Sequence, residues 1–302
     1  MGARGTTCRW YPPDESPLMS PQRIPRPIGD WTARKLEHLT AYLNAFTLAT
    51  TKARERYYID AMAGCGECVI RKTGYPTPGS AWRALNARPP FTKIHLVELD
   101  RSSSDYLTRQ MSPYPQVSVY QGDCNVVIPD LVLPNLSKIA PTLAFLDPTG
   151  VQPSWTLVRQ LATHRRGVKG RKIELLILFA FDMFINRWLE HDQLRPRLSA
   201  FYGNETWLDH LAESRRRGED VDARRARFMG LYTDQLRGEL GYRHVDVHGP
   251  LQKGRRVLYH MIFATDHDDA QRIMKDVWKK DRPVSGELFY QQRFELEPHN
   301  EE

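Results

Sequence analysis

Short apolar runs alternate with amphipathic stretches along most of the chain, and each run stops at small, acidic or proline residues. An apolar run of this length between turn residues predicts a buried strand. Before the first run, Leu36, Leu39 and Leu43 recur at helical spacing and predict a helix that begins after Asp30. The longest run is expected to be a central strand. The predicted strands are 57–62, 94–99, 117–120, 143–146 and 173–181.

The last hundred residues have a different pattern. Residues 186–240 are polar and strongly basic, which predicts a helical insertion. Two further apolar runs, 242–247 and 257–264, lie too close together for a crossover helix, so an antiparallel pair is expected. Asp269 is a candidate cap for a closing helix whose apolar face is formed by Ala270, Ile273, Met274, Val277 and Trp278.

The first 30 residues carry closely spaced prolines, which are incompatible with a helix or a paired strand, so an arm laid over the body is expected. The predicted organisation is a proline-rich N-terminal arm at 1–30, a core at 31–185, the basic helical insertion at 186–240, the continued core at 241–281 and a C-terminal tail at 282–302.

Strands that alternate with helices predict an α/β fold, with a doubly wound, mostly parallel sheet and helices on both faces. One antiparallel strand near the edge of such a sheet resembles the layout of class I methyltransferases, which have a Rossmann-type core. Because a fold does not establish a function, the strand ends must be considered individually.

The first strand is followed directly by Asp60-Ala61-Met62-Ala63-Gly64-Cys65-Gly66. Ligands of α/β sheets lie outside the carboxyl ends of the strands. Small residues there let the backbone approach a ligand, and glycine permits the sharp turn. In class I methyltransferases this turn holds the methionyl part of S-adenosylmethionine, which gives Asp60, Ala63, Gly64 and Gly66 as candidates. A short glycine-rich turn on its own can equally be a tight loop.

Acidic residues follow the next two strands. Glu98 ends the second strand, where a carboxylate accepts hydrogen bonds from both ribose hydroxyls. Its spacing from the glycines exceeds the ~20 residues of the nicotinamide fingerprint, and the third glycine is absent, which argues against NAD. After the third strand, Asp123 is placed to accept from an adenine amine, and the backbone N–H of Cys124 to face a ring nitrogen.

The fourth strand ends at Asp147-Pro148-Thr149-Gly150, where the transferred group and its acceptor would meet. Pro148 stiffens the turn and leaves the Asp147 carboxylate able to orient or deprotonate an acceptor N–H. A strand cap alone would also explain this acid. Four strand ends with the expected residue types in the expected order together predict S-adenosylmethionine as cofactor.

The chain also resembles the three-Cys-motif partner protein (TcmP) family, over roughly residues 31–280. The resemblance implies a methyltransferase-like Rossmann fold and a protein partner encoded nearby, but no substrate. It is carried by Tyr58-Ile59-Asp60-Ala61-Met62-Ala63-Gly64, Pro78-Gly79-Ser80, Gly122-Asp123, Phe145-Leu146-Asp147-Pro148-Thr149-Gly150 and Leu258-Tyr259-His260-Met261-Ile262-Phe263-Ala264, followed by Met274-Lys275-Asp276-Val277-Trp278.

Two positions depart from the family pattern. Its first loop is commonly Phe-Ala-Gly-Pro-Gly, where this chain has Met62 and Cys65 in place of the aromatic residue and the proline. Its fourth motif often has an aromatic residue, used by amino-group methyltransferases to stack on a target base, where this chain has Thr149. Base methylation therefore needs another aromatic residue, for which Phe179 and Phe181 are the candidates.

The cysteines admit two interpretations. Cys65 and Cys68 form a C-x-x-C, and Cys124 is expected nearby because the third strand ends at the same cleft. Three thiolates can bind zinc or an iron–sulfur cluster, although a structural zinc site normally has four ligands. Small, buried, reduced cysteines are the favoured interpretation, with a redox pair as a further alternative. No metal site is therefore predicted.

Composition adds little about chemistry. The 302 residues include 43 Lys+Arg and 36 Asp+Glu, so the net charge is +7. That charge favours an anionic partner such as nucleic acid, and it is also compatible with ordinary solubility. The basic groups are Arg165, Arg166, Lys169, Arg171 and Lys172, the insertion's Arg215–Arg217, Arg224, Arg225 and Arg227, and Lys253, Arg255 and Arg256.

No apolar run is long enough to span a membrane and no secretory signal is evident, so a cytoplasmic protein without a membrane partner is expected. The sequence thus predicts an S-adenosylmethionine-dependent methyltransferase. It does not identify the acceptor, for which an amino group on a nucleic acid or on a small metabolite is the candidate. The alternative is a non-catalytic methyltransferase-like module that binds nucleic acid or a partner protein.

Overall fold

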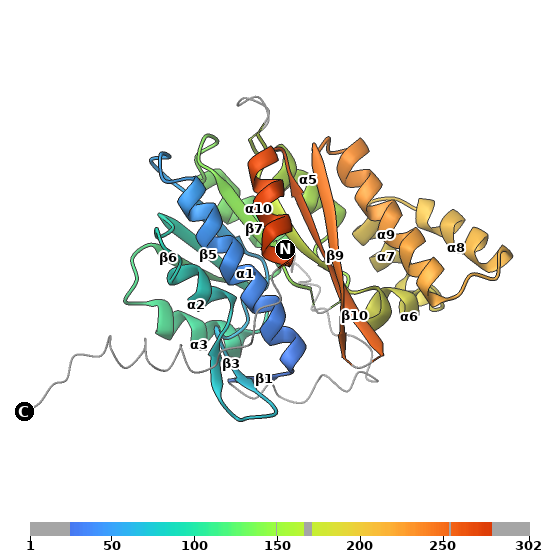
Figure 1. Ribbon diagram of the computed structural model, residues 1–302, viewed down its shortest axis with the longest axis horizontal. Coiled ribbons are helices and arrows are strands. Elements are labelled where there is room, and N and C mark those ends of the chain that lie inside the picture. Colours follow the sequence, from blue (N-terminus) through green and yellow to red (C-terminus); the bar gives the residue numbers. More distant parts are fainter. Residues whose placement is uncertain (1–24, 149, 166–170, 254, 280–302) are drawn as a thin grey trace, which may run out of the picture.

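The computed structural model describes residues 25–148, 150–165, 171–253 and 255–279 (Figure 1). The strands are β1 (Arg26–Ile28), β2 (Tyr57–Asp60), β3 (Glu67–Ile70), β4 (Pro76–Pro78), β5 (Lys93–Glu98), β6 (Val117–Gln121), β7 (Thr142–Leu146), β8 (Glu174–Phe179), β9 (His244–Lys253) and β10 (Arg256–Thr265). The α-helices are α1 (Asp30–Ala49), α2 (Ser80–Leu85), α3 (Arg101–Met111), α4 (Cys124–Val127), α5 (Trp155–Thr163), α6 (Asn186–Trp188), α7 (Arg195–Tyr202), α8 (Thr206–Arg216), α9 (Val221–Gly238) and α10 (Asp268–Lys279).

Single helical turns of other types complete the path. They are the π-helical turns η1 (Ile128–Val132) and η3 (Phe181–Ile185) and the 3₁₀ turns η2 (Leu133–Asn135) and η4 (Asp192–Leu194).

The main sheet of the described residues has seven strands in the order β6-β5-β2-β7-β8-β10-β9. The first five are mutually parallel, and β10 is antiparallel to both β8 and β9. This is the predicted doubly wound sheet with an antiparallel pair at one edge, and β8 is a central strand as expected. The chain has a methyltransferase-like α/β fold.

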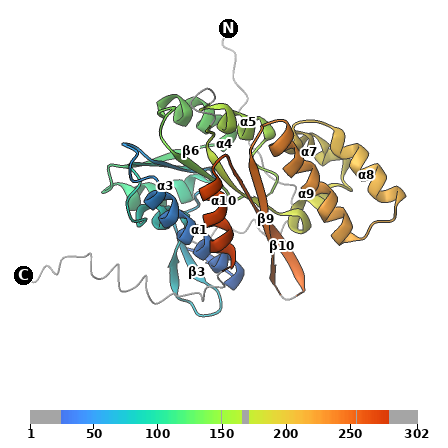
Figure 2. The ribbon, with the colours of Figure 1, turned by 45° about the horizontal axis from the view of Figure 1, so that its top comes forward.

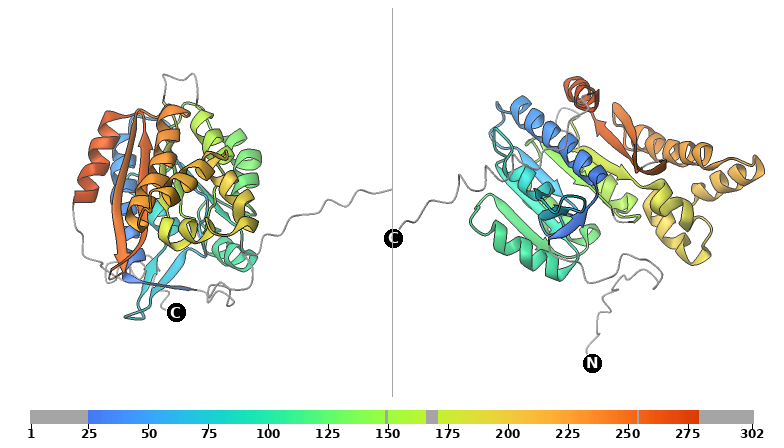
Figure 3. Two further views of the ribbon diagram at one scale, coloured as in Figure 1. Left: turned by 90° about the vertical axis from the view of Figure 1, so that its right-hand side faces the viewer. Right: turned by 60° about the horizontal axis from the view of Figure 1, so that its bottom comes forward.

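Both faces of the sheet are covered by helices, because its strands alternate their side chains between two cores. On β2, Tyr57 and Ile59 point into one core and Tyr58 into the other. The Tyr58 side is covered by α1, α2, α3 and α10, which lie toward the viewer in Figure 1. The opposite side is covered by α4, α5 and the helices after β8, so the sheet forms the middle of three layers (Figure 3).

The residues between β8 and β9 form the predicted helical insertion, α6 to α9. This insertion shares a core with the sheet. The Phe201 ring stacks on the Tyr232 ring with 4.9 Å between their centres, and the centre of the Trp155 ring of α5 lies 5.3 Å from that of the same tyrosine. The closing helix α10 begins at Asp268, one residue before the predicted cap. No helix of the described ranges has the length and apolar character needed to cross a membrane.

One expectation for the N-terminal arm was wrong. Residues 26–28 form a strand, although Pro27 lies within it, and they pair in parallel with β3 in a three-stranded sheet of order β1-β3-β4. Proline is tolerated because β1 is the edge strand, where one face of its backbone needs no partner. The rest of the predicted arm, residues 1–24, and the predicted tail, 282–302, lie outside the described residues.

A buried carboxyl group links β8 to α1 and to β10. Glu174 accepts hydrogen bonds from the Tyr42 hydroxyl at 2.5 Å and the Thr265 hydroxyl at 3.2 Å. Burial raises the pKa of Glu174 to about 7 from its ordinary 4.5. Between those values the folded protein binds a proton that the unfolded chain releases, so stability falls as the pH rises.

We expect Glu174→Gln to remove this pH dependence. The free energy of unfolding of the parent should carry a component that falls by up to about 1.4 kcal/mol per pH unit between pH ~5 and ~7. Urea unfolding at pH 5 and pH 8 measures it, with Glu205→Gln, on an exposed side chain, as the control. Equal pH slopes in the parent and in Glu174→Gln would contradict this assignment.

Candidate functional site

The predicted glycine turn lies at the carboxyl edge of the sheet, directly after β2. Gly64 and Gly66 have left-handed backbones, with φ of +65° and +79°. A Cβ on Gly66 would lie 2.7 Å from the Leu107 side chain, whereas a Cβ on Gly64 would meet nothing within 4 Å. The turn is fixed from both ends, since the Ala63 N–H donates to the Val97 carbonyl at 2.9 Å and the Gly66 carbonyl accepts from Gly79 at 2.8 Å. Gly64 therefore borders open space.

Glu98, at the end of β5, faces this turn. Its Oε2 accepts from the Gly64 N–H at 2.8 Å, and its Oε1 accepts from the Asp100 N–H at 2.8 Å. Burial raises the pKa of Glu98, and these two backbone donors oppose that shift by favouring the carboxylate. Each carboxylate oxygen has a further acceptor site, so the group is able to accept two hydroxyl donors as well.

The end of β6 adds the third predicted group. Asp123 caps α4 by accepting from the Asn125 N–H at 2.8 Å, which puts Cys124 in the first turn of that helix, where backbone N–H groups have no helical partner. The Gly122 N–H donates to the Glu98 carbonyl at 2.9 Å, so the two strand ends are in contact.

Two exposed apolar side chains accompany these acids, and the sequence motifs did not predict them. Leu99 is 50% exposed and Val126 is 57% exposed, one just after β5 and the other in α4. Leu99 directly follows Glu98, and Val126 lies in the helix that Asp123 caps. Each therefore offers apolar surface close in sequence to a strand-end acid. The sequence did hold one signal for this feature, because the apolar Leu99 directly follows the strand-end acid Glu98.

Asp60 lies beneath the turn. It is 0% exposed, and it accepts from the Tyr58 hydroxyl at 3.1 Å and the Met62 N–H at 3.3 Å. Burial raises its pKa to about 6, and the nearby charge of Asp147 acts in the same direction. The geometry therefore gives Asp60 a turn-holding role, while direct ligand contact by this residue stays a prediction.

Asp147 follows β7, between the ends of β2 and β8, and Pro148 behind it is buried. Its Oδ2 forms an ion pair with the ammonium of Lys35 on α1. The Lys35 side chain is buried, whereas that of Asp147 is 26% exposed. The same ammonium lies 5.8 Å from the centre of the Tyr259 ring of β10. Sequence reasoning missed Lys35, because nothing in a helical pattern marks one lysine as buried.

A second cation fixes α1 beside the site. The Arg83 guanidinium of α2 pairs with Glu37 at 3.0 Å and donates to the Thr40 hydroxyl at 2.6 Å. It also donates to the Pro78 carbonyl of β4 at 2.9 Å. These bonds tie the small sheet to the helix that carries Lys35.

The two aromatic residues named as stacking candidates lie at the end of β8, as predicted, but they are not exposed. Thr149 lies outside the described residues, and Phe179 and Phe181 are fully buried in the core, so neither is available to stack on an acceptor. Trp188 is half-buried and stands 3.5 Å from where a Cβ of Gly150 would lie. The Phe184 ring packs edge-on against the Trp188 ring, with 6.3 Å between their centres, so an aromatic pair lies beside the loop that follows Asp147.

The cysteine residues show no ligand arrangement. Cys65 and Cys124 are buried and Cys68 is half-buried, while Cys8 lies outside the described residues. Burial raises the pKa of Cys68 to about 11 and that of Cys124 to about 12, so both are thiols at neutral pH. Across the described ranges, no cluster of three or more His, Cys, Asp or Glu side chains is placed to hold a metal ion.

The six insertion arginines predicted as part of a basic surface do not form an open basic face. Acidic neighbours pair with all six. The pairs are Arg215 with Glu190, Arg216 and Arg217 with Glu213, Arg224 with Glu190, Arg225 with Asp182 and Asp222, and Arg227 with Glu219. The charge of this segment is therefore largely balanced within the fold.

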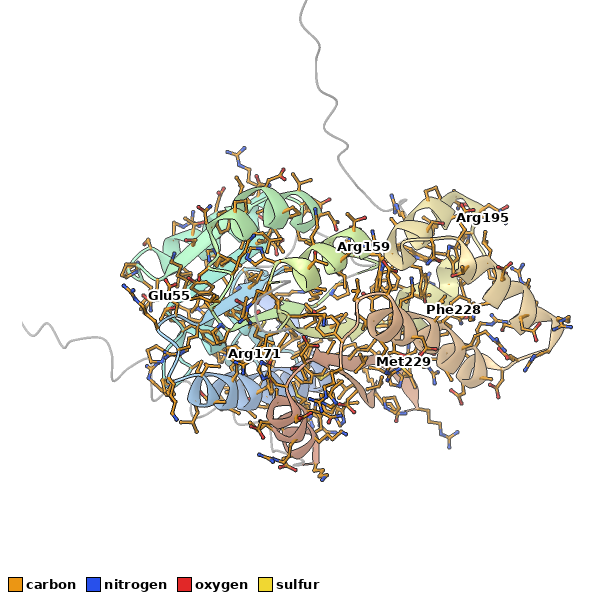
Figure 4. The ribbon with its side chains drawn as sticks, turned by 90° about the horizontal axis from the view of Figure 1, so that it is seen from above. Glu55, Arg159, Arg171, Arg195, Phe228 and Met229 are labelled. Carbon is orange, nitrogen blue, oxygen red and sulfur yellow. The ribbon has the colours of Figure 1, made fainter. Side chains whose placement is uncertain are left out.

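A broad depression of about 580 Å³ lies at the opposite, amino edge of the parallel strands. It is lined by charged side chains that include Arg171, Arg243 and Asp268. Figure 4 views the molecule from this edge, with Arg171 labelled. None of the predicted site residues contributes to its lining, so it is separate from the glycine turn.

No protein-family model matches the chain, and no curated protein matches it. Solved structures with a similar backbone fold include M. jannaschii TYW2 in complex with AdoMet. That structure is 11% identical in sequence, the match covers 77% of this chain and 74% of that one, and the TM-score is 0.35. A putative methyltransferase, yhhF, from Escherichia coli is 10% identical over 74% and 84% of the two chains, with a TM-score of 0.36. An rRNA methylase from Streptococcus thermophilus is 11% identical over 76% and 93%, with a TM-score of 0.36. The strand order carries the fold assignment.

We expect Lys35→Met to lower the free energy of unfolding by about 2–3 kcal/mol, because it leaves the Asp147 carboxylate without its partner. Lys35→Met/Asp147→Asn should cost less than the sum of the two single changes, and a double-mutant cycle by urea unfolding measures that coupling. The control is Lys275→Met, which breaks a more exposed pair with Asp246 and should cost below about 1 kcal/mol. Additive effects of the two single changes would show that the pair is not coupled.

Proposed function

We propose that this protein is an S-adenosylmethionine-dependent methyltransferase. The observation that carries the proposal is the hydrogen bond between the Glu98 carboxylate and the Gly64 N–H. It brings an acid suited to two ribose hydroxyls against a glycine turn that borders open space. A cofactor with a nucleoside and a cationic chain fits this combination of an acid, an apolar surface and a small-residue turn.

Each part of that cofactor has protein groups suited to it. Glu98 would accept from the ribose hydroxyls, Leu99 and Val126 would contact the faces of the adenine, and Asp123 with the Cys124 N–H would bind its edge. Ala63, Gly64 and Gly66 would let the methionyl part approach the backbone, above the buried Asp60. The bound cofactor supplies an electrophilic methyl group on a sulfonium.

Transfer takes place at Asp147 in this proposal. Lys35 holds the carboxylate through Oδ2, so Oδ1 is left to accept an N–H from the acceptor and to fix its direction. Pro148 limits the freedom of the turn. The acceptor nitrogen gains the methyl group and loses its proton, which Asp147 or water takes up.

The acceptor class in this proposal is an amino group, on a nucleic acid or on a small metabolite. The resemblance to the three-Cys-motif partner family extends the proposal to a protein partner encoded nearby. The alternative, a non-catalytic module that binds nucleic acid or such a partner, is favoured by one observation, since Lys35 occupies part of the Asp147 carboxylate. That module would bind its partner without forming a methylated product.

We expect Glu98→Gln to weaken binding of S-adenosylmethionine and S-adenosylhomocysteine by about 10- to 100-fold, since charge-assisted hydrogen bonds contribute about 1.5–3 kcal/mol. Titration calorimetry of the purified protein measures both ligands. Asp105→Asn, which removes an exposed acid of α3, is the control and should bind like the parent. Failure of the parent to bind either ligand would refute the proposed function, and unchanged binding by Glu98→Gln would refute this site.

A further inference from the structure

Two hairpins extend beyond the carboxyl edge of the sheet, one on each side of Asp147. In the sheet order, β7 lies between β2 and β8. The chain leaves β2 through the glycine turn and forms the β3–β4 hairpin. On the other side, His260 of β10 lies opposite Phe179, the last residue of β8, so the start of β10 and its partner in β9 continue past that edge. Both hairpins point toward the bottom of the picture in Figures 1 and 2.

Both hairpin ends carry exposed cations. The β3–β4 turn has Arg71 and Lys72, and the β9–β10 end has Lys253, Arg255 and Arg256. Within the part of the chain that the structure describes, none of the five forms an ion pair, and the Arg71 guanidinium donates only to the Pro27 carbonyl, at 3.5 Å. By contrast, Arg215, Arg216 and Arg217 of the insertion are paired with Glu190 and Glu213. Uncompensated positive charge therefore stands on both sides of the transfer site.

Aromatic side chains lie in the turn of one hairpin and beside the loop that follows Asp147. Tyr75 in the β3–β4 turn is 59% exposed, next to the Arg71 and Lys72 positions. Phe184 and Trp188 lie beside the Asp147 loop, as described above. Cations that follow a backbone, together with aromatic rings on which bases stack, are the recurring features of single-strand nucleic-acid binding. An unpaired base also reaches a recessed carboxylate without the cost of leaving a duplex.

We infer that the two hairpin ends bind a single-stranded polynucleotide that runs across the carboxyl edge. Arg71 and Lys72 hold its phosphates on one side, Lys253, Arg255 and Arg256 hold them on the other, and Tyr75 stacks on a base. The base between them lies against Phe184 and Trp188, with its amino group at Asp147. Only that last step rests on the proposed function, because strand binding needs no cofactor.

Fluorescence anisotropy tests this with a labelled single strand of about 20 nucleotides, as RNA and as DNA, and with the matching duplex. Lys253→Gln/Arg255→Gln/Arg256→Gln should weaken single-strand binding at least tenfold at 0.1 M salt. Its slope of log affinity against log salt should shrink by about 2, because each phosphate of a single strand that a cation neutralises adds ~0.7 to that slope. Arg71→Gln/Lys72→Gln should act in the same direction, and Tyr75→Ala should weaken binding about fivefold or more without changing the slope.

The control removes three charges from the insertion instead. Arg215→Gln/Arg216→Gln/Arg217→Gln should stay within twofold of the parent. An equal loss in this control would show diffuse charge attraction and overturn the inference, as would a preference for the duplex. Competition by polyglutamate as strong as by the unlabelled strand would point to an acidic protein partner and also overturn it.

Calorimetry with S-adenosylmethionine on the same variants separates the two proposals. If variants that no longer bind the single-stranded polynucleotide still bind the cofactor like the parent, the acceptor surface is separate from the cofactor site. A parent that binds the strand but no cofactor leaves this inference standing and removes the proposed function. A parent that binds the cofactor but no strand removes this inference alone.

Discussion

An ion pair between the buried ammonium of Lys35 and the partly exposed carboxylate of Asp147 connects the first helix to the middle of the sheet. The lysine is removed from water and needs a partner, so the position of α1 and the turn after β7 depend on each other. The same ammonium lies over the Tyr259 ring of β10. One charge thus joins three segments that are distant in sequence, at the point where the acceptor would be held.

The candidate cofactor and acceptor groups around Asp147 come from different strand ends. The β2, β5 and β6 ends supply the glycine turn, Glu98 and Asp123, and Glu98 bonds directly to the turn. The β7 end supplies Asp147, and the segment after β8 supplies Trp188. Arg83 fastens the small sheet to α1, so the hairpin beside the cofactor side is fixed to the same helix that fixes Asp147. Cofactor and acceptor would therefore meet between the small sheet and the Asp147 turn, which are both anchored to α1.

Much of the fold could be predicted from the sequence, because apolar runs such as 57–62 and 143–146 end at clear turn residues, Gly64 in one case and Asp147-Pro148 in the other. The strand-end acids were predicted for the same reason, since their place follows from the strands. Other features depend on tertiary contacts. Pro27 lies in a strand only because β3 offers an edge, Phe179 and Phe181 are buried by the insertion helices, and Lys35 is notable only because Asp147 lies opposite. Charge pairing in the insertion could be predicted only in part, because acids at helical spacing account for some of the pairs and Glu190 and Asp182 come from outside α8 and α9.

Amide hydrogen exchange with and without S-adenosylhomocysteine tests whether the cofactor binds at the carboxyl ends of β2, β5 and β6. Binding should slow exchange in three separate segments that meet only in the folded chain: 61–66, 97–100 and 122–126. Exchange around Arg171 and Arg243, at the opposite edge, should not change. Protection confined to that opposite edge, or no protection in any of the three segments, would contradict the account.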